Sequence, residues 1–406
     1  MLNINDYAPI VGQNVIDELY LLAEAFKGKI VQNINSTPVG GGVAEILTRM
    51  IPLLRQLGVD ARWDVIKGDE KFFSITKKIH NALHGVNVLI SAEDLKYFLQ
   101  VNRENAEEIN LYGDVLFIHD PQPIALVERK NDSEKKWFWR CHIDFTEPNL
   151  DIMNFLKTYI EKYDCAVFSA PAFSRDLKIP QFLISPSIDP LSDKNKELPQ
   201  KLIDSTLESF GIDRERPVVT QISRFDYLKD PLGVVEVYKK VKKHIDCQLV
   251  LAGGGATDDP EGLKVLEEVK SATSGDPDAH VIFLPPASDR EINALQRAST
   301  VVLQKSLKEG FGLTVAEALW KAKPVIASAV GGIPLQITHK YSGILAHSVD
   351  GTAFYLKQLL SDPEFAKRLG ANGKEHIRNN FLITRHIRDY LLLFISLYYE
   401  GDVIYL

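Results

Sequence analysis

The sequence has few cysteines and no pattern that would place them in a disulfide or zinc framework. Its three cysteines are odd in number and stand far apart among 406 residues, whereas disulfide frameworks and structural metal sites use paired, closely spaced ligands. We therefore expect reduced, packed thiols in a cytoplasmic protein, and no metal site. The cysteines concerned are Cys141, Cys165 and Cys247.

Long apolar runs and blocks of one charge are also missing. The apolar stretch at 390–399 is too short to span a bilayer, and the first residues lack the basic, apolar and small-residue regions of a secretory signal. The formal net charge is -7, with acids and bases interspersed, so no basic surface for nucleic acid or anionic lipid is expected. A small-molecule partner is favoured, and homo-oligomer formation stays open.

Short apolar, β-rich runs alternate with helical patterns in two successive series, which is typical of parallel sheets with crossover helices. A stretch rich in Pro, Ser and Asp at 185–199 has neither period and is interpreted as an interdomain connection. The sequence thus predicts an α/β protein of two doubly wound, Rossmann-like domains that face each other across a ligand cleft. Residues 1–199 would form the first domain and 200–385 the second, with a C-terminal helix at 386–406 packing back on the first. The expected strands are residues 28–33, 61–66, 115–119, 165–169, 182–184, 217–222, 247–252, 281–284, 300–303, 324–327 and 343–345.

The most specific motif is Glu-Gly-Phe-Gly-Leu-Thr-Val-Ala-Glu at 309–317, which follows a predicted strand. Ligands gather at the carboxyl ends of strands in open α/β sheets, where helix N-termini offer free N–H groups to anions. Glu309 precedes the glycine turn, and Glu317 stands about one turn into the predicted helix. The turn itself is expected to bind phosphate through Gly310, Phe311, Gly312, Leu313 and Thr314.

Two further turns could serve the same ligand. Arg224 and Lys229 come after the predicted strand at 217–222, where a guanidinium fork and a compact ammonium together suit a diphosphate. Gly41 and Gly42 follow the first predicted strand and would let a bound group approach the backbone closely, although simple packing explains such a turn equally well. A fourth turn, at 252–256, needs no role beyond flexibility at the rim of the site.

Ionisable residues also follow two segments of the first half. His119 and Asp120 close the predicted strand at 115–119, and the run 140–144 comes soon after it. Such residues at strand ends are candidates for a site, while a structural hydrogen bond is the alternative for the histidine.

Together these residues resemble the retaining family 4 glycosyltransferases of the GT-B fold, over nearly the whole chain. Glu309 and Glu317 are similar to the E-x7-E pair of that family, and Arg224 and Lys229 to its phosphate-binding Arg and Lys. A closer similarity, to the trehalose glycosyltransferring synthases and the retaining trehalose phosphorylases, rests on three segments: 119–123, 139–144 and 187–195. Leu335 is a departure, since many family members carry Glu at that position.

The resemblance implies transfer of glucose from ADP-, UDP- or GDP-glucose to free glucose, giving α,α-trehalose without a cofactor or a divalent ion. It implies that Glu309 holds hydroxyls of the donor sugar, that Glu317 binds the ribose, and that His119 lies near the donor sugar. Arg224, Lys229 and the amides near Leu313 would neutralise the leaving diphosphate. The acceptor side would be lined by Asp120, Arg140, His142 and Asp144.

Three other functions compete with this one. A trehalose phosphorylase would use the same cationic pocket for inorganic phosphate, and a sugar-nucleotide epimerase or a noncatalytic nucleotide-sugar binding protein could share the fold. The run at 140–144 argues against the last two. An oxidoreductase is disfavoured because no Gly-x-Gly-x-x-Gly turn is followed by an acidic residue at the proper distance. The preferred base stays open.

Overall fold

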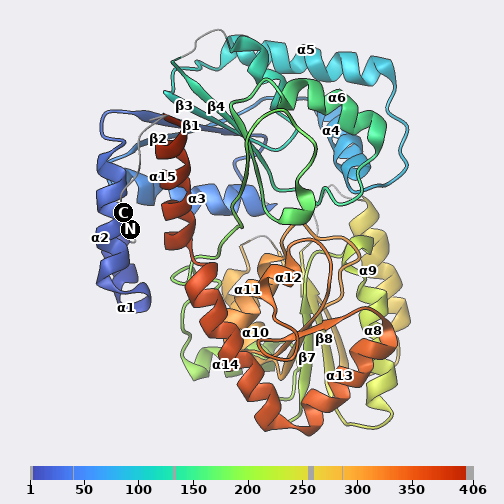
Figure 1. Cartoon of the computed structure of the whole chain (residues 1–406). Coiled ribbons are helices and arrows are strands. Elements are labelled where there is room, and N and C mark those ends of the chain that lie inside the picture. Colours follow the sequence, from blue (N-terminus) through green and yellow to red (C-terminus); the bar gives the residue numbers. More distant parts are fainter. Residues whose placement is uncertain (1–2, 40, 131–133, 255–259, 286, 399–406) are drawn as a thin grey trace. The chain divides into compact units, whose positions relative to one another are not determined.

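The computed structural model describes residues 3–39, 41–130, 134–254, 260–285 and 287–398. The chain divides into two compact units, which are described separately below (Figure 1). The first comprises residues 1–187 together with 383–406, and the second comprises residues 188–382.

The segment 188–199 belongs to the second unit. The chain therefore passes from the first unit to the second at residue 188, earlier than the expected boundary at 199. The side chain of Asn293 explains this, because its Nδ2 donates to the carbonyl oxygens of Asp193, at 2.9 Å, and Lys196, at 2.8 Å. Arg297 adds hydrogen bonds to the carbonyl oxygens of Asn195 and Lys196. These bonds fasten the segment to the helix that carries Asn293 and Arg297.

The described part of the first unit contains one parallel sheet of six strands in the order β2-β1-β3-β4-β5-β6. The chain places β2 on one side of β1 and β3 on the other, so a topological switch point lies between β1 and β3. The strands are β1 (Ile30–Asn35), β2 (Asp60–Val65), β3 (Val115–His119), β4 (Lys136–Cys141), β5 (Cys165–Phe168) and β6 (Gln181–Leu183).

β4 is absent from the strands expected from the sequence. Its run Lys-Trp-Phe-Trp-Arg-Cys does not alternate polar and apolar residues, yet all but its first residue are buried. A central strand of a parallel sheet is covered on both faces, so it needs no alternation and can bury large aromatic side chains. The insertion of β4 between β3 and β5 brings the ends of β3 and β4 side by side.

Helices and short 3-10 turns connect these strands. α15 returns the chain to the first unit, where the Phe394 ring packs against Phe26, Phe117 and Phe138 with centroid separations of 5.6, 5.8 and 5.6 Å. The helix expected at 386–406 begins at Ile383, and residues 399–406 lie outside the described residues. The helices are α1 (Ala8–Val11), α2 (Gln13–Glu24), α3 (Gly41–Gln56), α4 (Glu70–Leu83), α5 (Ala92–Glu108), α6 (Leu150–Ile160) and α15 (Ile383–Tyr398), with 3-10 turns at Ile4–Tyr7, Ile124–Arg129 and Pro171–Phe173.

The second unit is built, in its described part, on another parallel sheet of six strands, in the order β12-β11-β10-β7-β8-β9. Its switch point lies between β7 and β10. Alternate residues of the strands enter two apolar cores: Val219 and Leu249 belong to one, and Val218 and Val250 to the other. The strands are β7 (Val218–Ile222), β8 (Gln248–Gly253), β9 (Ala279–Phe283), β10 (Val301–Gln304), β11 (Val325–Ser328) and β12 (Ile344–Ala346).

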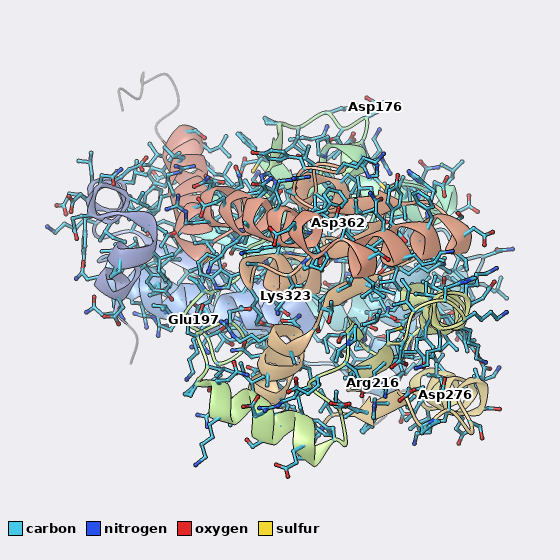
Figure 2. All side chains as sticks on the ribbon, turned by 90° about the horizontal axis from the view of Figure 1, so that it is seen from below. Asp176, Glu197, Arg216, Asp276, Lys323 and Asp362 are labelled. Atoms are coloured by element: carbon cyan, nitrogen blue, oxygen red, sulfur yellow. The ribbon has the colours of Figure 1, made fainter. Side chains whose placement is uncertain are left out.

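The helices of this unit surround the sheet, as Figure 1 shows. Before β7, Arg216, which is labelled in Figure 2, donates to the carboxylates of Asp246 and Asp278. Its guanidinium holds the pKa of Asp246 at about 2. The helices are α7 (Gln200–Ser209), α8 (Pro231–Lys242), α9 (Pro260–Ala272), α10 (Asp289–Ala298), α11 (Leu313–Trp320), α12 (Ile333–Gln336), α13 (Val349–Ser361) and α14 (Pro363–Asn380), with a 3-10 turn at Tyr227–Lys229.

All three cysteines are buried and carry free thiols. Within the described ranges, none of the helices combines the length and apolar character needed to cross a lipid bilayer.

Candidate active site

The carboxyl ends of β7 and β10 bring Lys229 and Glu309 together at the switch point of the second sheet. The Lys229 ammonium donates to Glu309 Oε2 at 2.7 Å, and the Ser306 hydroxyl donates to the same oxygen at 3.1 Å. Gln221, on β7, fixes the backbone of Lys229 by donating to its carbonyl oxygen at 2.8 Å. Two residues that are 80 positions apart in the sequence thus form one ion pair.

A second cation lies beside this pair. Lys305 directly follows β10, and its ammonium pairs with the carboxylate of Asp230. Asp230 has a left-handed backbone with a φ of 47°, and its Oδ1 accepts from the Gly233 amide at 3.0 Å, which caps α8. A Cβ at Gly233 would come within 2.2 Å of Asp230 Oδ2, so only glycine allows this close approach. Sequence reasoning missed Lys305, although its place at the end of a predicted strand was a usable signal.

The glycine turn between Glu309 and α11 is held tightly. Gly312 has a φ of 83°, and a Cβ there would meet Glu309 Cγ at 3.2 Å. Gln336 Nε2 donates to the Phe311 carbonyl oxygen at 2.6 Å, and the Thr314 hydroxyl donates to Gln304 Oε1 at 3.2 Å. Gly312 has no side chain to cap the first turn of α11, so the first backbone amides of the helix stay available to an anion. These amides begin at Leu313, four residues after Glu309.

Glu317 lies farther along α11 and is nearly enclosed, with only 2% of its surface exposed. Gln296 Nε2, on α10, lies 3.4 Å from Glu317 Oε2, and the Lys194 ammonium lies 3.9 Å from Oε1. Two lysines follow it: Lys321, whose burial lowers its pKa to about 7, and Lys323, labelled in Figure 2, whose burial lowers its pKa to about 8. No local sequence pattern predicts so enclosed a carboxylate.

Arg224 differs from these residues because its side chain is 62% exposed. A guanidinium nitrogen lies 3.6 Å from Asp226 Oδ2, a separation at which a surface ion pair is weak. Most of the guanidinium therefore remains open to a ligand.

In the first unit, His119 ends β3 beside β1. Its Nε2 lies 3.0 Å from Asn33 Oδ1, and its Nδ1 lies 3.3 Å from His142 Nε2. An amide oxygen only accepts, so His119 Nε2 carries the proton and His119 Nδ1 accepts from His142 Nε2. This chain of bonds leaves Nδ1 of His142 as an acceptor. Asp120 joins the group by accepting the His142 amide at Oδ1, at 2.8 Å. The structure thus brings together three predicted residues and adds Asn33, for which the sequence offered no distinct motif.

Burial sets the charge state of this group. It lowers the pKa of His119 to about 3 and that of His142 well below its usual value, and the nearby Arg140 guanidinium acts in the same direction. Burial raises the pKa of Asp120 to about 6, against the opposing effects of the His142 amide and Arg140. His386, on α15, likewise has a pKa well below its usual value because it is buried. The histidines are therefore neutral at pH 7.

The remaining residues predicted for the first unit have different surroundings. Arg140 is fully buried and donates to the Ser169 hydroxyl at 3.2 Å, while its Nε and one terminal nitrogen have no hydrogen-bond partner among the described residues. Asp144 is buried and accepts from the Thr146 amide at 2.9 Å. Gly41 begins α3 and Gly42 follows it with its surface exposed, whereas Gly40, and Gly255 and Ala256 of the turn at 252–256, lie outside the described residues.

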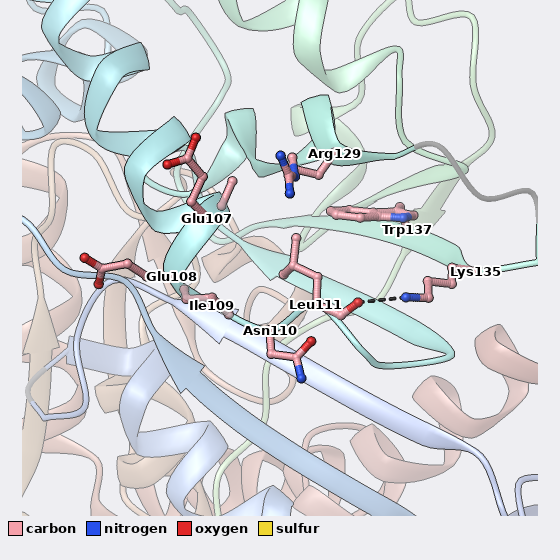
Figure 3. Close-up of a pocket in the computed structure, with 9 residues that line it drawn as sticks. Glu107, Glu108, Ile109, Asn110, Leu111, Arg129, Lys135 and Trp137 are labelled. Atoms are coloured by element: carbon pink, nitrogen blue, oxygen red, sulfur yellow. Dashed lines mark hydrogen bonds between the residues drawn. The ribbon is translucent and has the colours of Figure 1, made fainter.

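A pocket of about 470 Å³ lies elsewhere on the first unit, where the loop before β3 meets the start of β4 (Figure 3). It is lined by Glu107, Arg129 and Trp137 among others, and the Lys135 ammonium donates across it to the Leu111 carbonyl oxygen at 2.7 Å. None of the residues predicted for the site lines this pocket. Across the described ranges, no group of three or more His, Cys, Asp or Glu side chains could hold a metal ion.

Two family models match the chain: "Trehalose synthase, N-terminal domain" over residues 33–175 and "Glycosyl transferases group 1" over residues 203–376. The chain is 45% identical to the trehalose synthase of Thermococcus litoralis over 394 residues, which cover 96% of this chain and 95% of the relative. It is 28% identical to a trehalose phosphorylase of Pleurotus pulmonarius over 458 residues, which cover 99% of this chain and 62% of that relative.

Among solved structures, a sucrose-phosphate synthase of Thermosynechococcus elongatus matches with a TM-score of 0.71 at 18% identity. The match covers 92% of this chain and all of that one. At this level of identity, the likeness shows that the two chains share the GT-B fold, built from two parallel-sheet α/β domains.

Proposed function

The chain belongs to the trehalose synthase family and is a trehalose-related hexosyltransferase of the GT-B fold, and from this we propose that it makes α,α-trehalose from a nucleoside diphosphate glucose and free glucose. We further propose that the transfer proceeds with retention of configuration at the donor carbon. The proposal rests on residues of both units, and the second unit carries most of it.

The observation that carries the proposal is the Lys229–Glu309 ion pair beside the Gly312 turn. A nucleotide sugar needs cations for its diphosphate next to a hydrogen-bond acceptor for its sugar hydroxyls. The Lys229 ammonium lies 2.7 Å from Glu309 Oε2, and Gly312 begins α11 within contact distance of Glu309. Phosphate bound by Lys229, Arg224 and the first amides of α11 would therefore leave the attached sugar close to Glu309.

These groups stabilise charge where it develops during transfer. The bond between the anomeric carbon and the diphosphate oxygen breaks, the acceptor oxygen bonds to that carbon on the same face, and its proton passes to the departing diphosphate. Lys229, Arg224 and the helix amides neutralise the charge on the leaving group, which is the largest single contribution expected for such a step. The carboxylate of Glu309 holds donor hydroxyls and forms no covalent bond.

The neutral histidines of the first unit suit recognition of an uncharged sugar. His142 presents Nδ1 as an acceptor because its Nε2 donates to His119, and the His142 backbone amide fixes the Asp120 carboxylate by donating to its Oδ1. Neutral hydrogen-bonding groups satisfy hydroxyls without the desolvation cost of a charge. We therefore assign His142 to the acceptor side. From the family resemblance we also assign the Asp120 carboxylate to the acceptor side and His119 to the donor sugar, while Arg140 and Asp144 act on the acceptor side from buried positions.

The competing candidate is a trehalose phosphorylase, to which the chain is less similar. Two reactions separate the candidates: ADP-, UDP- or GDP-glucose with glucose, and trehalose with inorganic phosphate. We expect trehalose and a nucleoside diphosphate in the first reaction and no glucose 1-phosphate in the second. Phosphorolysis without any activity on nucleotide sugars would overturn the proposal.

Glu309→Gln tests the central residue. The substitution keeps the shape of the side chain but removes the charge that pairs with Lys229. We expect kcat to fall by about a hundredfold or more, as when a group acting mainly in the transition state is removed, while nucleoside diphosphate affinity changes little. Glu364→Gln, at the exposed start of α14, is the matched control and should leave both unchanged. Unaltered turnover in Glu309→Gln would place the reacting sugar elsewhere.

A further inference from the structure

One motif that the proposed mechanism leaves unused is the segment Asp189–Asn195, which precedes α7. Its backbone is folded on itself: Asn195 Nδ2 and the Ser192 hydroxyl both donate to the Asp189 carbonyl oxygen, at 3.0 and 2.9 Å. Asn195 Oδ1 in turn accepts from the Lys321 ammonium at 2.9 Å. Because Lys321 lies directly after α11, the segment is fastened to the helix that carries Glu317.

Lys194 lies in this segment, and its ammonium lies near two carboxylates. Its ammonium lies 3.9 Å from Glu317 Oε1 and 3.8 Å from Asp289 Oδ1, and its side chain is only 14% exposed. Gln296 Nε2 approaches the other oxygen of Glu317 at 3.4 Å. The two oxygens of one enclosed carboxylate are therefore approached by different groups, from the segment 189–195 and from α10.

We propose that Lys194 is a positioning residue that fixes the Glu317 carboxylate for the ribose hydroxyls of the donor, so that the chain prefers ribonucleotides to deoxyribonucleotides. The proposal deepens the proposed function and rests on it, because the family resemblance that implies a nucleotide-sugar donor also implies that Glu317 binds the ribose of that donor. Enclosing a carboxylate is costly unless charged or hydrogen-bonding groups compensate. Lys194 supplies such a group, and it also limits the directions in which the carboxylate can turn.

The rigidity of the segment lowers the conformational entropy that is lost when Lys194 holds the Glu317 carboxylate. A long lysine side chain normally loses conformational entropy when it is held in one place. Here the bonds of Asn195 and Ser192 restrict the backbone on both sides of Lys194, and its two carboxylate neighbours restrict the ammonium. A ribose hydroxyl gains more binding free energy by donating to a carboxylate that is already held in place than by donating to a carboxylate that binding must first order.

The test compares nucleoside diphosphates with their 2′-deoxy and 3′-deoxy analogues, using calorimetry on the full chain. The base is the one among adenine, uracil and guanine whose diphosphate binds most tightly. In the unmodified chain, loss of the more important hydroxyl should weaken binding by about tenfold or more, as expected for a hydrogen bond to a charged group. In Lys194→Met, this ratio should fall to within about twofold of unity.

Control variants separate positioning from simple loss of structure or charge. Lys194→Arg should keep most of the ratio, because it restores a cation. Lys196→Met removes a lysine two positions on, whose ion pair is with Asp193, and should leave the ratio unchanged. Lys194→Gln takes the place of Lys194→Met if the methionine variant does not fold. Equal weakening of the ribose and deoxyribose ligands would overturn the inference, because the charge would then act on phosphate.

Glu317→Gln distinguishes failure of this inference from failure of the proposed function. If Glu317→Gln abolishes the ribose preference while Lys194→Met preserves it, Lys194 has no positioning role and the donor assignment stands. If the ribose preference is absent from the unmodified chain, or survives in Glu317→Gln, the ribose assignment itself is wrong. The inference about Lys194 is then overturned with it.

Discussion

The buried histidines of the first unit should make its stability depend on pH. His119, His142 and His386 all have pKa values far below the ordinary value of a histidine, mainly because they are buried. Between pH 7 and pH 5 the unfolded chain takes up a proton at each of them, whereas the folded chain does not. Stability therefore falls as the pH falls below about 6.5, the usual pKa of an unfolded histidine.

The size of the effect follows from the same linkage. Each pH unit below the pKa of the unfolded histidine, about 6.5, is worth about 1.4 kcal/mol. A histidine that stays neutral in the folded chain at pH 5 therefore lowers the free energy of unfolding by about 2 kcal/mol relative to pH 7. Asp120 acts in the opposite direction: its pKa of about 6 lets the folded chain bind a proton before the unfolded chain does, which offsets about 1 kcal/mol. With three histidines, the first unit should lose about 4 to 5 kcal/mol of its free energy of unfolding.

Tryptophan fluorescence during urea unfolding can follow this unit, because Trp63, Trp137 and Trp139 belong to it and only Trp320 belongs to the second. The urea midpoint of the first unit should drop strongly between pH 7 and pH 5.

Two histidine variants make that measurement specific. His386→Gln should reduce the pH dependence by about 2 kcal/mol, the share of one histidine. His244→Gln, at an exposed position of the second unit, is the control and should have no effect on it. A midpoint that does not change with pH, or a pH dependence that His386→Gln leaves intact, would refute the assignment of neutral buried histidines.

Two further predictions concern the second unit. In Gly312→Ala the left-handed backbone should cost about 1 to 2 kcal/mol, and the new Cβ would push on Glu309 Cγ at 3.2 Å. Steady-state kinetics should then show kcat reduced by about tenfold to a hundredfold, and unchanged turnover would argue against a catalytic Glu309. Arg224→Met should raise the dissociation constant of the nucleoside diphosphate, measured by calorimetry, by about tenfold or more. Arg214→Met removes an arginine of similar exposure, 59% against 62%, and should leave that constant unchanged; equal effects of the two substitutions would count against a specific phosphate contact.

Much of the second unit's site could be predicted from local sequence, because its residues follow strands within a few positions. Glu309 and Lys229 each stand in a short loop after a strand, and the carboxyl ends of parallel strands meet at one edge of the sheet. The same rule could have found Lys305 and Ser306, which directly follow β10. These residues carry no glycine or repeated spacing that would draw attention to them.

Other features depend on contacts between distant segments and leave no local pattern. The strand β4 escaped prediction because Lys136 and Arg140 interrupt its apolar run, although Arg140 is buried. The enclosure of Glu317 depends on Lys194, which lies 123 positions earlier in the sequence. The neutral state of His119 depends on burial and on its place next to Asn33 and His142. Tertiary structure alone determines these properties.

The most direct test of the proposed reaction is the configuration of its product. The chain is incubated with unlabelled glucose and a nucleoside diphosphate glucose that carries ¹³C at the anomeric carbon, and the disaccharide is examined by NMR. We predict α,α-trehalose in which the label occupies one anomeric carbon in the α configuration, together with an equal amount of nucleoside diphosphate. A labelled carbon in the β configuration, or trehalose without the label, would contradict retaining transfer from a nucleotide sugar.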